Sequence, residues 1–343
     1  MSQKADLKSM TPQELAIFLG SLGQPAYRAG QVYAWLHRGV ASFDEMTDLS
    51  KELRQLLKEK AEISSIIIKK RLESTLDNTV KYLYGLSDGE SIESVLMSYS
   101  YGTSICISTQ VGCRMDCGFC ASGIAGFKRN LEPSEMLDQI LFAKRDSGRD
   151  ISHLVLMGIG EPLDNYDNVV KFLEILSCKG GLNMSLRHVS LSTCGIVDKI
   201  YELMALRLQL TLSVSLHAPS DEIRSKIMPV NKKWGVDELL RACKVYAEAT
   251  GRRISFEYLL LAGVNDKAED AKLLCAKLKG ILCHVNLIPV NEVKEKEYKK
   301  SSDENVRRFC SILSGCGLNV TVRRTLGADI NASCGQLRRS EEL

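Results

Sequence analysis

Apolar and polar positions alternate along most of the chain in a pattern typical of strands followed by helices. From about residue 103, short apolar runs are followed by loops with glycine or serine and then by segments with helical apolar spacing. Strands are predicted at 104–108, 154–157, 188–192, 210–215, 254–260, 284–288 and 319–322. Helices are predicted between them at 133–144, 169–176, 199–205, 236–249, 267–279 and 304–313. This alternation predicts parallel βα units in a partial barrel, with functional groups at the carboxyl ends of the strands.

The first hundred residues follow a different pattern. Residues 1 to about 62 have helical apolar spacing, and Thr11-Pro12-Gln13-Glu14 matches a capping box with proline at the first helical position. Residues 66–68, 80–86 and 92–97 are strand-like, with hairpin turns expected at Asp77-Asn78 and Asp88-Gly89. We therefore expect an α/β fold with an accessory domain of helices and a small β region over residues 1–100. Residues 101–343 are expected to form a partial (β/α)6-type barrel.

Composition indicates a globular protein, since 45% of the residues are hydrophobic and 25% are charged. No apolar run is long enough to cross a membrane, and the N-terminus lacks the apolar stretch of a secretory signal. We expect a cytoplasmic protein. In that compartment many of the 12 cysteines would be free thiols, and structural disulfides would not form.

The net charge of +3 is only weakly basic and neither requires nor excludes a nucleic acid partner. Basic doublets nevertheless recur along the chain. Most such doublets are solvated, but several on one side would form a phosphate-binding surface. They are Lys69-Lys70-Arg71, Lys232-Lys233, Arg252-Arg253, Lys299-Lys300, Arg307-Arg308, Arg323-Arg324 and Arg338-Arg339.

Three cysteines, Cys113, Cys117 and Cys120, are spaced C-x₃-C-x₂-C. Three thiolates can hold three irons of a [4Fe–4S] cube and leave the fourth iron open for a substrate, whereas a closed cluster needs a fourth protein ligand. A structural zinc site is the main alternative, because zinc usually has four ligands and Cys106 is the nearest further sulfur. A second alternative is that the spacing is a coincidence and the three cysteines pack as small apolar residues. Phe119 and the surrounding glycines favour the open cluster, since they suit close wrapping around a bulky ligand.

A glycine-rich turn, residues 157–162, follows a predicted strand with the sequence MGIGEP. An ordinary strand-to-helix turn is one interpretation, and the chain has no ATP-type P-loop motif. The other is that Gly160 lets the backbone approach a polar ligand. Glu161 or an adjacent carbonyl would then accept hydrogen bonds from the ammonium group of an amino acid.

Polar groups also follow other predicted strands. The hydroxyls of Ser192 and Ser215 suit ribose and carboxylate contacts, although strand-end serines are often turn formers. His217 alone is more often structural than catalytic, and Asn291 suits an adenine or ribose contact. Cys334 lies in a polar segment of small residues after the last predicted strand, which predicts an exposed flexible loop with a reactive thiol.

Taken together, these motifs identify a family. The segments CISTQVGCRMDCGFCASG, MGIGEP, LSTCGI, SLHAP, NLIPVN and CGQL resemble the radical S-adenosylmethionine adenine methyltransferases of the RlmN/Cfr type. The resemblance covers nearly the whole chain. It implies one [4Fe–4S] cluster on Cys113, Cys117 and Cys120, and two molecules of S-adenosylmethionine per turnover. The residues that would contact S-adenosylmethionine are Gly160, Glu161, Ser192, Ser215, Leu216, His217 and Asn291.

The resemblance also implies the catalytic residues. Cys334 matches a cysteine that is itself methylated before the methyl carbon reaches the adenine ring. Cys106 matches a second cysteine, which releases the product by forming a transient disulfide with Cys334. Glu93 matches a glutamate that accepts the ring proton; without the resemblance it would be taken for a solvated strand residue.

Substrate and partners follow from the same resemblance. We expect methylation of carbon 2 of a specific adenosine in 23S rRNA and in tRNA, with carbon 8 methylation of 23S rRNA, an antibiotic-resistance activity, as the alternative. An external electron donor such as flavodoxin or ferredoxin is implied, and a monomer without membrane association is expected. Two hypotheses from other classes are an iron–sulfur redox or sensor protein and a zinc-stapled RNA-binding module.

Overall fold

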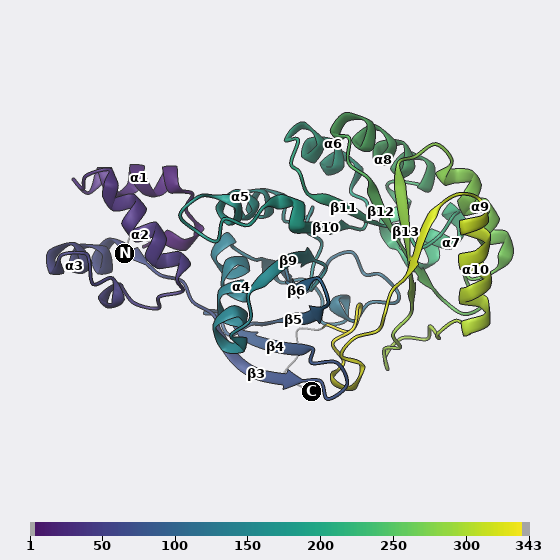
Figure 1. Cartoon of the computed structure of the whole chain (residues 1–343), viewed down its shortest axis with the longest axis horizontal. Coiled ribbons are helices and arrows are strands. Elements are labelled where there is room, and N and C mark those ends of the chain that lie inside the picture. The colour runs from purple at the N-terminus through teal and green to yellow at the C-terminus, as the bar shows by residue number, and fades with distance from the viewer. Residues whose placement is uncertain (1–3, 338–343) are drawn as a thin grey trace.

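Ten strands form one continuous sheet in the computed structural model, which describes residues 4–337 (Figure 1). The strand order is β14-β13-β12-β11-β10-β9-β6-β5-β4-β3. The strands from β6 to β14 in this series pair in parallel, each with the next along the chain, as in an open barrel. The predicted partial barrel is therefore confirmed. These parallel strands are β6 (Gly102–Cys106), β9 (Ile151–Leu156), β10 (Val189–Thr193), β11 (Thr211–Ser215), β12 (Ile254–Leu260), β13 (Cys283–Pro289) and β14 (Asn319–Val322).

All the helices predicted for the barrel are present, with ends that differ by a few residues. The short α7 (Asp221–Ile227) was not predicted, because its polar sequence DEIRSKI lacks a clear apolar period. The predicted helices are α4 (Pro133–Ser147), α5 (Tyr166–Ser177), α6 (Val197–Ala205), α8 (Val236–Thr250), α9 (Ala268–Leu278) and α10 (Asp303–Gly315). Short 3₁₀ turns occur at Leu7–Ser9, Phe43–Glu45, Ala121–Gly123, Leu186–His188, Pro229–Lys232 and Ala328–Ile330.

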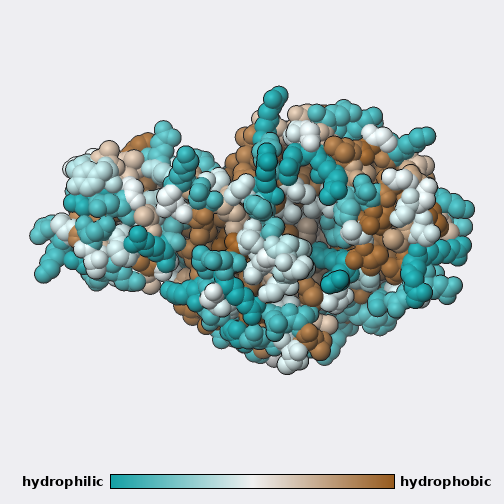
Figure 2. All heavy atoms as spheres, viewed as in Figure 1, coloured by the Kyte–Doolittle hydropathy of each residue, from teal (hydrophilic) through white to brown (hydrophobic). Residues whose placement is uncertain are grey.

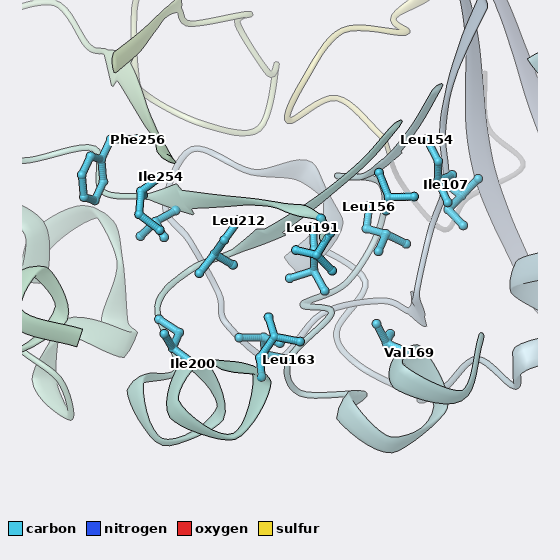
Figure 3. Packing of buried hydrophobic residues seen from close by; sticks show 14 of the residues in the cluster. Ile107, Leu154, Leu156, Leu163, Val169, Leu191, Ile200, Leu212, Ile254 and Phe256 are labelled. Carbon is cyan, nitrogen blue, oxygen red and sulfur yellow. The ribbon is translucent and has the colours of Figure 1, made fainter. Parts of the chain in front are cut away.

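The main hydrophobic core lies between the sheet and these helices. Figure 3 shows strand residues such as Leu191 and Leu212 pointing toward Leu163, Val169 and Ile200 on the helical side. Since side chains alternate along a strand, the residues between these apolar positions point into the barrel. Many of them are polar, so the lumen is not filled with bulky apolar side chains as in a closed (β/α)8 barrel. They include Ser190, Ser213, Ser255, Asn286 and Thr321.

The N-terminal helices have a separate hydrophobic core and project from one end of the molecule (Figure 1). They are α1 (Pro12–Ser21), α2 (Tyr27–His37) and α3 (Lys51–Lys60), and β1 (Ala5–Asp6) pairs with β2 (Ala61–Glu62) beside them. The predicted capping box is confirmed: Glu14 N–H donates to Thr11 Oγ1 (3.2 Å), and Thr11 N–H donates to Glu14 Oε2 (2.8 Å).

Buried polar contacts attach these helices to the barrel. The Lys8 ammonium lies 2.7 Å from the Asp138 carboxylate of α4, and both side chains are 1% exposed. The Tyr33 hydroxyl donates to the carbonyl of Ile175 on α5 (3.0 Å). The attachment therefore depends on specific polar groups as well as apolar packing.

Strands β3 (Ile67–Glu73), β4 (Val80–Gly85) and β5 (Ser91–Tyr99) are antiparallel and extend the barrel sheet from β6. The predicted hairpin turns connect them. The sheet thus runs without interruption across residue 100. On the face shown in Figure 2, hydrophilic residues are spread over the surface and hydrophobic residues gather in separate patches. Within residues 4–337, no helix is long and apolar enough to cross a membrane.

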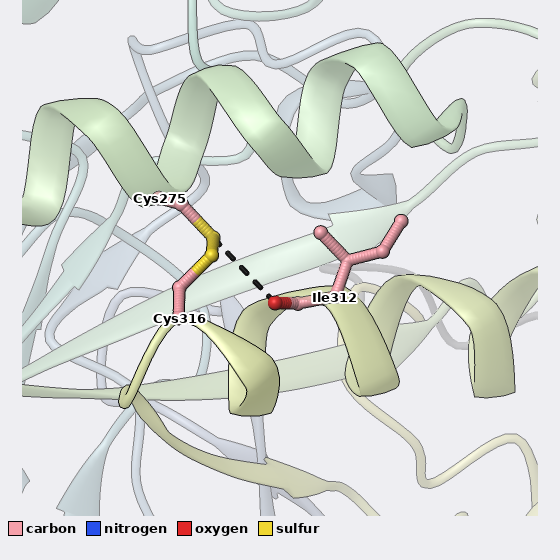
Figure 4. Close-up of a disulfide and its surroundings, with 3 residues drawn as sticks. All are labelled: Cys275, Ile312 and Cys316. Carbon is pink, nitrogen blue, oxygen red and sulfur yellow. Dashed lines mark hydrogen bonds between the residues drawn. A yellow bond between two sulfur atoms is a disulfide. The ribbon is translucent and has the colours of Figure 1, made fainter.

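One expectation about the cysteines is wrong. Cys275 of α9 forms a disulfide with Cys316, the residue after α10, and the Cα–Cα distance is 6.2 Å (Figure 4). The two cysteines are 41 residues apart in the sequence. Only the packing of α9 against α10 brings them together, and a compartment argument from composition gives no information about such packing.

Candidate active site

The three cysteines predicted as ligands lie on one loop at one cavity. This three-cysteine loop, residues 112–128, joins the short strands β7 (Gln110–Val111) and β8 (Arg129–Asn130). Cys113, Cys117 and Cys120 all line the central cavity, which lies at the carboxyl ends of the parallel strands. Burial raises the pKa of Cys113 to about 12 and raises the pKa of Cys117 well above its usual value. Thiolates therefore need a bound cation here, and an iron–sulfur cluster provides one.

Zinc with Cys106 as fourth ligand does not fit this arrangement. Cys106 ends strand β6 and lines a different cavity, which it shares with Cys334. Nowhere in the described part of the chain do three His, Cys, Asp or Glu side chains converge as ligands of a single metal ion would. In a cube each cysteine binds a separate iron, so the three thiols do not need to meet at one point.

The glycines of MGIGEP are required by contacts within the protein. A Cβ atom on Gly158 would lie 2.6 Å from the Ile107 carbonyl carbon, and one on Gly160 would lie 2.6 Å from Gln110 Cβ. Gly160 also has a φ of 105°. These glycines let the turn pack directly on residues 107–110, which precede the three-cysteine loop. Gly160 still borders the central cavity, but close backbone packing explains both glycines.

Glu161 is buried and braces two loops. Its Oε1 accepts from Leu163 N–H (3.0 Å), and its Oε2 accepts from Cys194 N–H (2.7 Å). Burial raises its pKa, although these hydrogen bonds oppose the shift. The carboxylate borders the central cavity, as expected for a ligand contact. Its two oxygens, however, already hold the loops that follow β9 and β10 in place.

Other predicted contacts also meet at the central cavity. Ser192, Ser215, His217 and Asn291 line it, whereas Leu216 is buried behind it and does not. His217 Nδ1 accepts from Leu259 N–H (3.0 Å), and burial lowers the pKa of His217 to about 3. The imidazole is therefore neutral, with its proton on Nε2.

The loop that carries Cys334, here called the thiol loop (residues 323–337), is better fixed than the sequence predicted. Asp329 accepts hydrogen bonds from the Ser74 hydroxyl (2.7 Å) and Thr75 N–H (3.0 Å), and Gly327 N–H donates to Asp77 (2.8 Å). Ala332, Ser333 and Leu337 are buried, while Cys334 is half-buried. An exposed flexible loop was expected from its small polar residues, but the hairpin between β3 and β4 holds it.

The thiol loop is also bonded to the three-cysteine loop. Ala121 N–H donates to the Gly335 carbonyl (2.8 Å), and the Ser122 hydroxyl donates to the Leu337 carbonyl (2.9 Å). Asn291 Nδ2 donates to the Cys334 carbonyl (3.2 Å). As a result Cys334 lines the same cavity as the three cysteines. Asn291, predicted as a ligand contact, helps to position Cys334 as well.

Cys334 lines a second cavity too, here called the thiol cavity, together with Cys106. Arg323 borders both cavities, and the nearby Cys334 raises the pKa of its guanidinium. Burial raises the pKa of Cys106 to about 12. The two thiols for which the family resemblance implies a transient disulfide thus line one cavity, with a guanidinium beside them.

Glu93 is buried in β5 and pairs with a lysine. Its Oε1 lies 2.9 Å from Lys81 Nζ, and both side chains are at most 1% exposed. Lys81 also donates to the Asn331 carbonyl of the thiol loop (3.2 Å). By strand alternation, Glu93 shares a face with Val95 and Met97, which line the thiol cavity. Glu93 itself is not among the residues that line it.

Besides Lys81, sequence reasoning missed two buried charged residues at this site. Arg224 of α7 is fully buried and donates to the carbonyls of Cys194 (2.6 Å), Ser215 (3.0 Å) and Leu216 (2.9 Å). It thereby ties together the ends of β10 and β11. Glu257 points into the barrel from β12, where burial raises its pKa. The polar alternation of ISFEY in β12 was a usable signal for Glu257, whereas Arg224 had none.

Comparisons with known proteins agree with this geometry. Residues 107–275 match the Radical SAM superfamily, and residues 5–63 match the Ribosomal RNA large subunit methyltransferase N-terminal domain. A Desulforamulus reducens protein named "Probable dual-specificity RNA methyltransferase RlmN" is 51% identical over 342 residues, which span 99% of this chain and 98% of that protein. This chain belongs to the RlmN family. A Clostridium botulinum protein with the same name is 54% identical over 330 residues, 96% of this chain and 95% of that one.

A solved structure has the same fold. The crystal structure of a radical SAM methyltransferase from Sphaerobacter thermophilus superposes with a TM-score of 0.94 at 40% identity, over 98% of this chain and all of that one (100%). Radical S-adenosylmethionine proteins use one [4Fe–4S] cluster and S-adenosylmethionine. The residues present fit both, because three half-buried thiols and a set of polar strand ends border one cavity.

Proposed function

We propose that this protein methylates carbon 2 of a specific adenosine in 23S rRNA and in tRNA. One observation carries the proposal. Cys334 borders the cavity of the three cysteines on one side and lies beside Cys106 on the other. A methyl-accepting thiol between a radical source and a second thiol is the arrangement that this chemistry needs. The RNA substrates are inferred from the full-length relatives, whose name includes dual specificity for RNA.

The roles of the protein residues follow from their surroundings. Cys334 accepts a methyl group as a nucleophilic thiol and carries it to the ring carbon. Glu93 takes up the proton from the ring, and Lys81 compensates its charge before that step. Cys106 then attacks the sulfur of Cys334. The new S–S bond replaces the bond from this sulfur to the methylene carbon, which leaves with the electron pair and gains a proton to become the methyl group of the product. When bound, the cluster and S-adenosylmethionine supply the methyl group and the radical that activates it.

The remaining predicted residues bind and orient S-adenosylmethionine. Ser192 and Ser215 offer hydroxyls at neighbouring strand ends, and neutral His217 offers an N–H group. Glu161 acts through the two loops that it holds, because its carboxylate already accepts two backbone hydrogen bonds. Leu216, which is buried directly after β11, acts by packing behind the cavity.

The proposal extends to partners. Residues 1–100, the predicted accessory domain, would contribute to RNA binding; the separate core of the N-terminal helices is compatible with such a module. A one-electron donor such as flavodoxin or ferredoxin would reduce the cluster. The protein would act as a cytoplasmic monomer.

Two cysteine variants test the reaction. In anaerobically reconstituted protein, Cys334→Ala removes the methyl acceptor, and we expect no methylated RNA. Cys106→Ala should instead accumulate protein covalently linked to RNA through the Cys334 methylene, detected by mass spectrometry. Cys310→Ala is the matched control, because this half-buried free thiol lies on α10 away from the cavity lining. Normal turnover of Cys106→Ala without any adduct would contradict the proposed role of Cys106.

The position of the methyl group requires its own measurement. Mass spectrometry of nucleosides from the modified RNA, with synthetic standards, separates 2-methyladenosine from 8-methyladenosine. We expect the 2-methyl product, since the matching relatives carry the RlmN name. The 8-methyl product alone would establish the alternative activity.

A further inference from the structure

The barrel lumen contains a cavity on the side opposite the strand ends that line the central cavity. It has a volume of about 1060 Å³, slightly above the roughly 300–1,000 Å³ typical of ligand pockets. Residues near the amino ends of the parallel strands line it, among them Ser190 of β10, Thr211 of β11 and His284 of β13. We call this the lumen cavity. Its polar lining is suited to a hydrated or polar ligand.

The lumen cavity adjoins the reactive thiols. Met157 and Arg323 line the lumen, thiol and central cavities alike. Tyr99 and Arg324 line both the lumen cavity and the thiol cavity. A ligand seated in the lumen would therefore reach toward Cys334 from the side that the predicted S-adenosylmethionine contacts leave open.

The lining carries an excess of positive charge. Four arginines border the lumen cavity, whereas Glu257 is the one carboxylate among its lining residues. Glu257 is itself satisfied, because Ser255 (3.0 Å) and Asn286 (2.8 Å) donate to its oxygens. Arg253 and Arg324 are exposed and form no ion pair with any residue in 4–337. The four arginines are Arg252, Arg253, Arg323 and Arg324.

An aromatic pair lies at the rim. The rings of Tyr99 and Tyr101 are stacked, with centroids 4.9 Å apart and planes inclined by 8°, at the turn between β5 and β6. Tyr101 is 64% exposed, and His153 packs against it edge to face. An exposed, supported ring that lines the same cavity as Arg253 and Arg324 has the chemistry of a site for a nucleic acid base and its phosphates.

We propose that the lumen cavity binds the single-stranded RNA around the target adenosine. The base next to the target stacks on Tyr101, Arg253 and Arg324 bind its phosphates, and the extruded target enters the lumen toward Cys334. This inference rests on the proposed function and adds the path by which RNA reaches the thiol. A base inside a duplex cannot reach the half-buried thiol, so extrusion is required. Two of the basic doublets noted in the sequence, Arg252-Arg253 and Arg323-Arg324, meet at this cavity.

Direct binding measurements test the inference with the full-length, reconstituted protein. The probe is a tRNA transcript, and its dissociation constant is measured by filter binding over a range of salt concentrations. Tyr101→Ala should weaken binding about 5- to 150-fold, the range expected for loss of one stacked base, whereas Tyr101→Phe should retain most of the affinity. Arg253→Ala and Arg324→Ala should each reduce the slope of log affinity against log salt by about one.

Matched controls come from the outer helices. Tyr201→Ala removes a 37% exposed ring of α6, and Arg241→Ala removes an exposed guanidinium of α8; both should bind RNA like the parent protein. If the parent protein methylates RNA but Tyr101→Ala and both arginine variants bind it normally, the inference is wrong and the proposed function stands. If the parent protein neither binds nor methylates RNA, the proposed function fails, and this inference fails with it.

Discussion

The buried ion pair between Lys8 and Asp138 should control how firmly the N-terminal helices are attached to the barrel. Both side chains are 1% exposed, and their charged atoms lie 2.7 Å apart. Removing one partner leaves the other charge buried without compensation, which costs about 3–5 kcal/mol. Lys8→Met and Asp138→Leu should therefore each lower the free energy of unfolding by about that amount.

The double variant Lys8→Met/Asp138→Leu should be much less affected than either single variant, because no uncompensated charge remains. It still leaves Ile66 N–H without the Asp138 oxygen at 3.4 Å, and a lost hydrogen bond of this kind costs about 1–3 kcal/mol. Lys171→Met is the control. It removes an exposed pair with Glu14 across the same interface and should cost only about 0–1 kcal/mol.

The cost of removing Lys8 should also depend on pH. Burial raises the pKa of Asp138 from 3.8 to about 6 even with Lys8 present. Because the folded-state pKa is raised, the contribution of this carboxyl is fully favourable below pH 3.8 and is lost as the pH rises through about 6. Without the ammonium group the pKa rises further, so Lys8→Met should be most destabilised at alkaline pH and least at acidic pH.

Urea denaturation followed by circular dichroism measures these differences, and limited proteolysis near residues 61–66 reports detachment of the helices. The decisive quantity is the coupling free energy of the double-mutant cycle. If the single variants lose no more stability than Lys171→Met, or if the double variant loses the sum of the two single losses at every pH, the buried pair does not act as described.

Further predictions concern the site and the outer helices. Gly160→Ala places a methyl group against the neighbouring strand at a φ of 105° and should lower the melting temperature clearly, while Gly263→Ala, with φ of 73° and open space around it, should have a smaller effect. Arg224→Met removes the guanidinium that donates to the carbonyls of Cys194, Ser215 and Leu216, of which Leu216 keeps the Ala218 N–H as a donor; it should cost at least about 1–3 kcal/mol in urea unfolding, with weaker S-adenosylmethionine binding by calorimetry. Dithiothreitol should lower the melting temperature of the parent protein but not of Cys275→Ser, because the disulfide to Cys316 closes a 41-residue segment; equal shifts in both would contradict this.

The sequence predicted the barrel well because its strands and helices carry strong local patterns. Strand residues 254–260 and 319–322 were placed without error, since the apolar and polar positions there follow the period of a strand. The short helix α7 lacks such a pattern and was missed. The three cysteines and several strand-end residues were brought together as expected, because parallel strands end at the same side of a sheet.

The parts that sequence reasoning missed depend on contacts between distant segments. Lys81 forms a buried ion pair with Glu93, and the buried Arg224 donates to carbonyls at the ends of β10 and β11. Both buried charges become evident only in the folded protein. The flexible loop expected around Cys334 is fixed by hydrogen bonds to residues 74–77, far away in the sequence. The polar lumen was visible in the alternating serines and threonines of the strands, but that pattern also fits a solvated sheet face.

The hydrogen bond from the Ser122 hydroxyl to the Leu337 carbonyl joins the three-cysteine loop to the thiol loop, between residues that are 215 positions apart. During synthesis, the ribosome completes the three-cysteine loop long before the thiol loop emerges. Contacts across such long stretches form late in folding, because a large loop must close first. Until residues 323–337 are made, the growing chain lacks Cys334 and the hydrogen bonds between the thiol loop and the three-cysteine loop. If iron binds the three cysteines before synthesis ends, the Cys334 thiol cannot compete for it. The methyl-accepting thiol would reach the cavity only after the chain is complete.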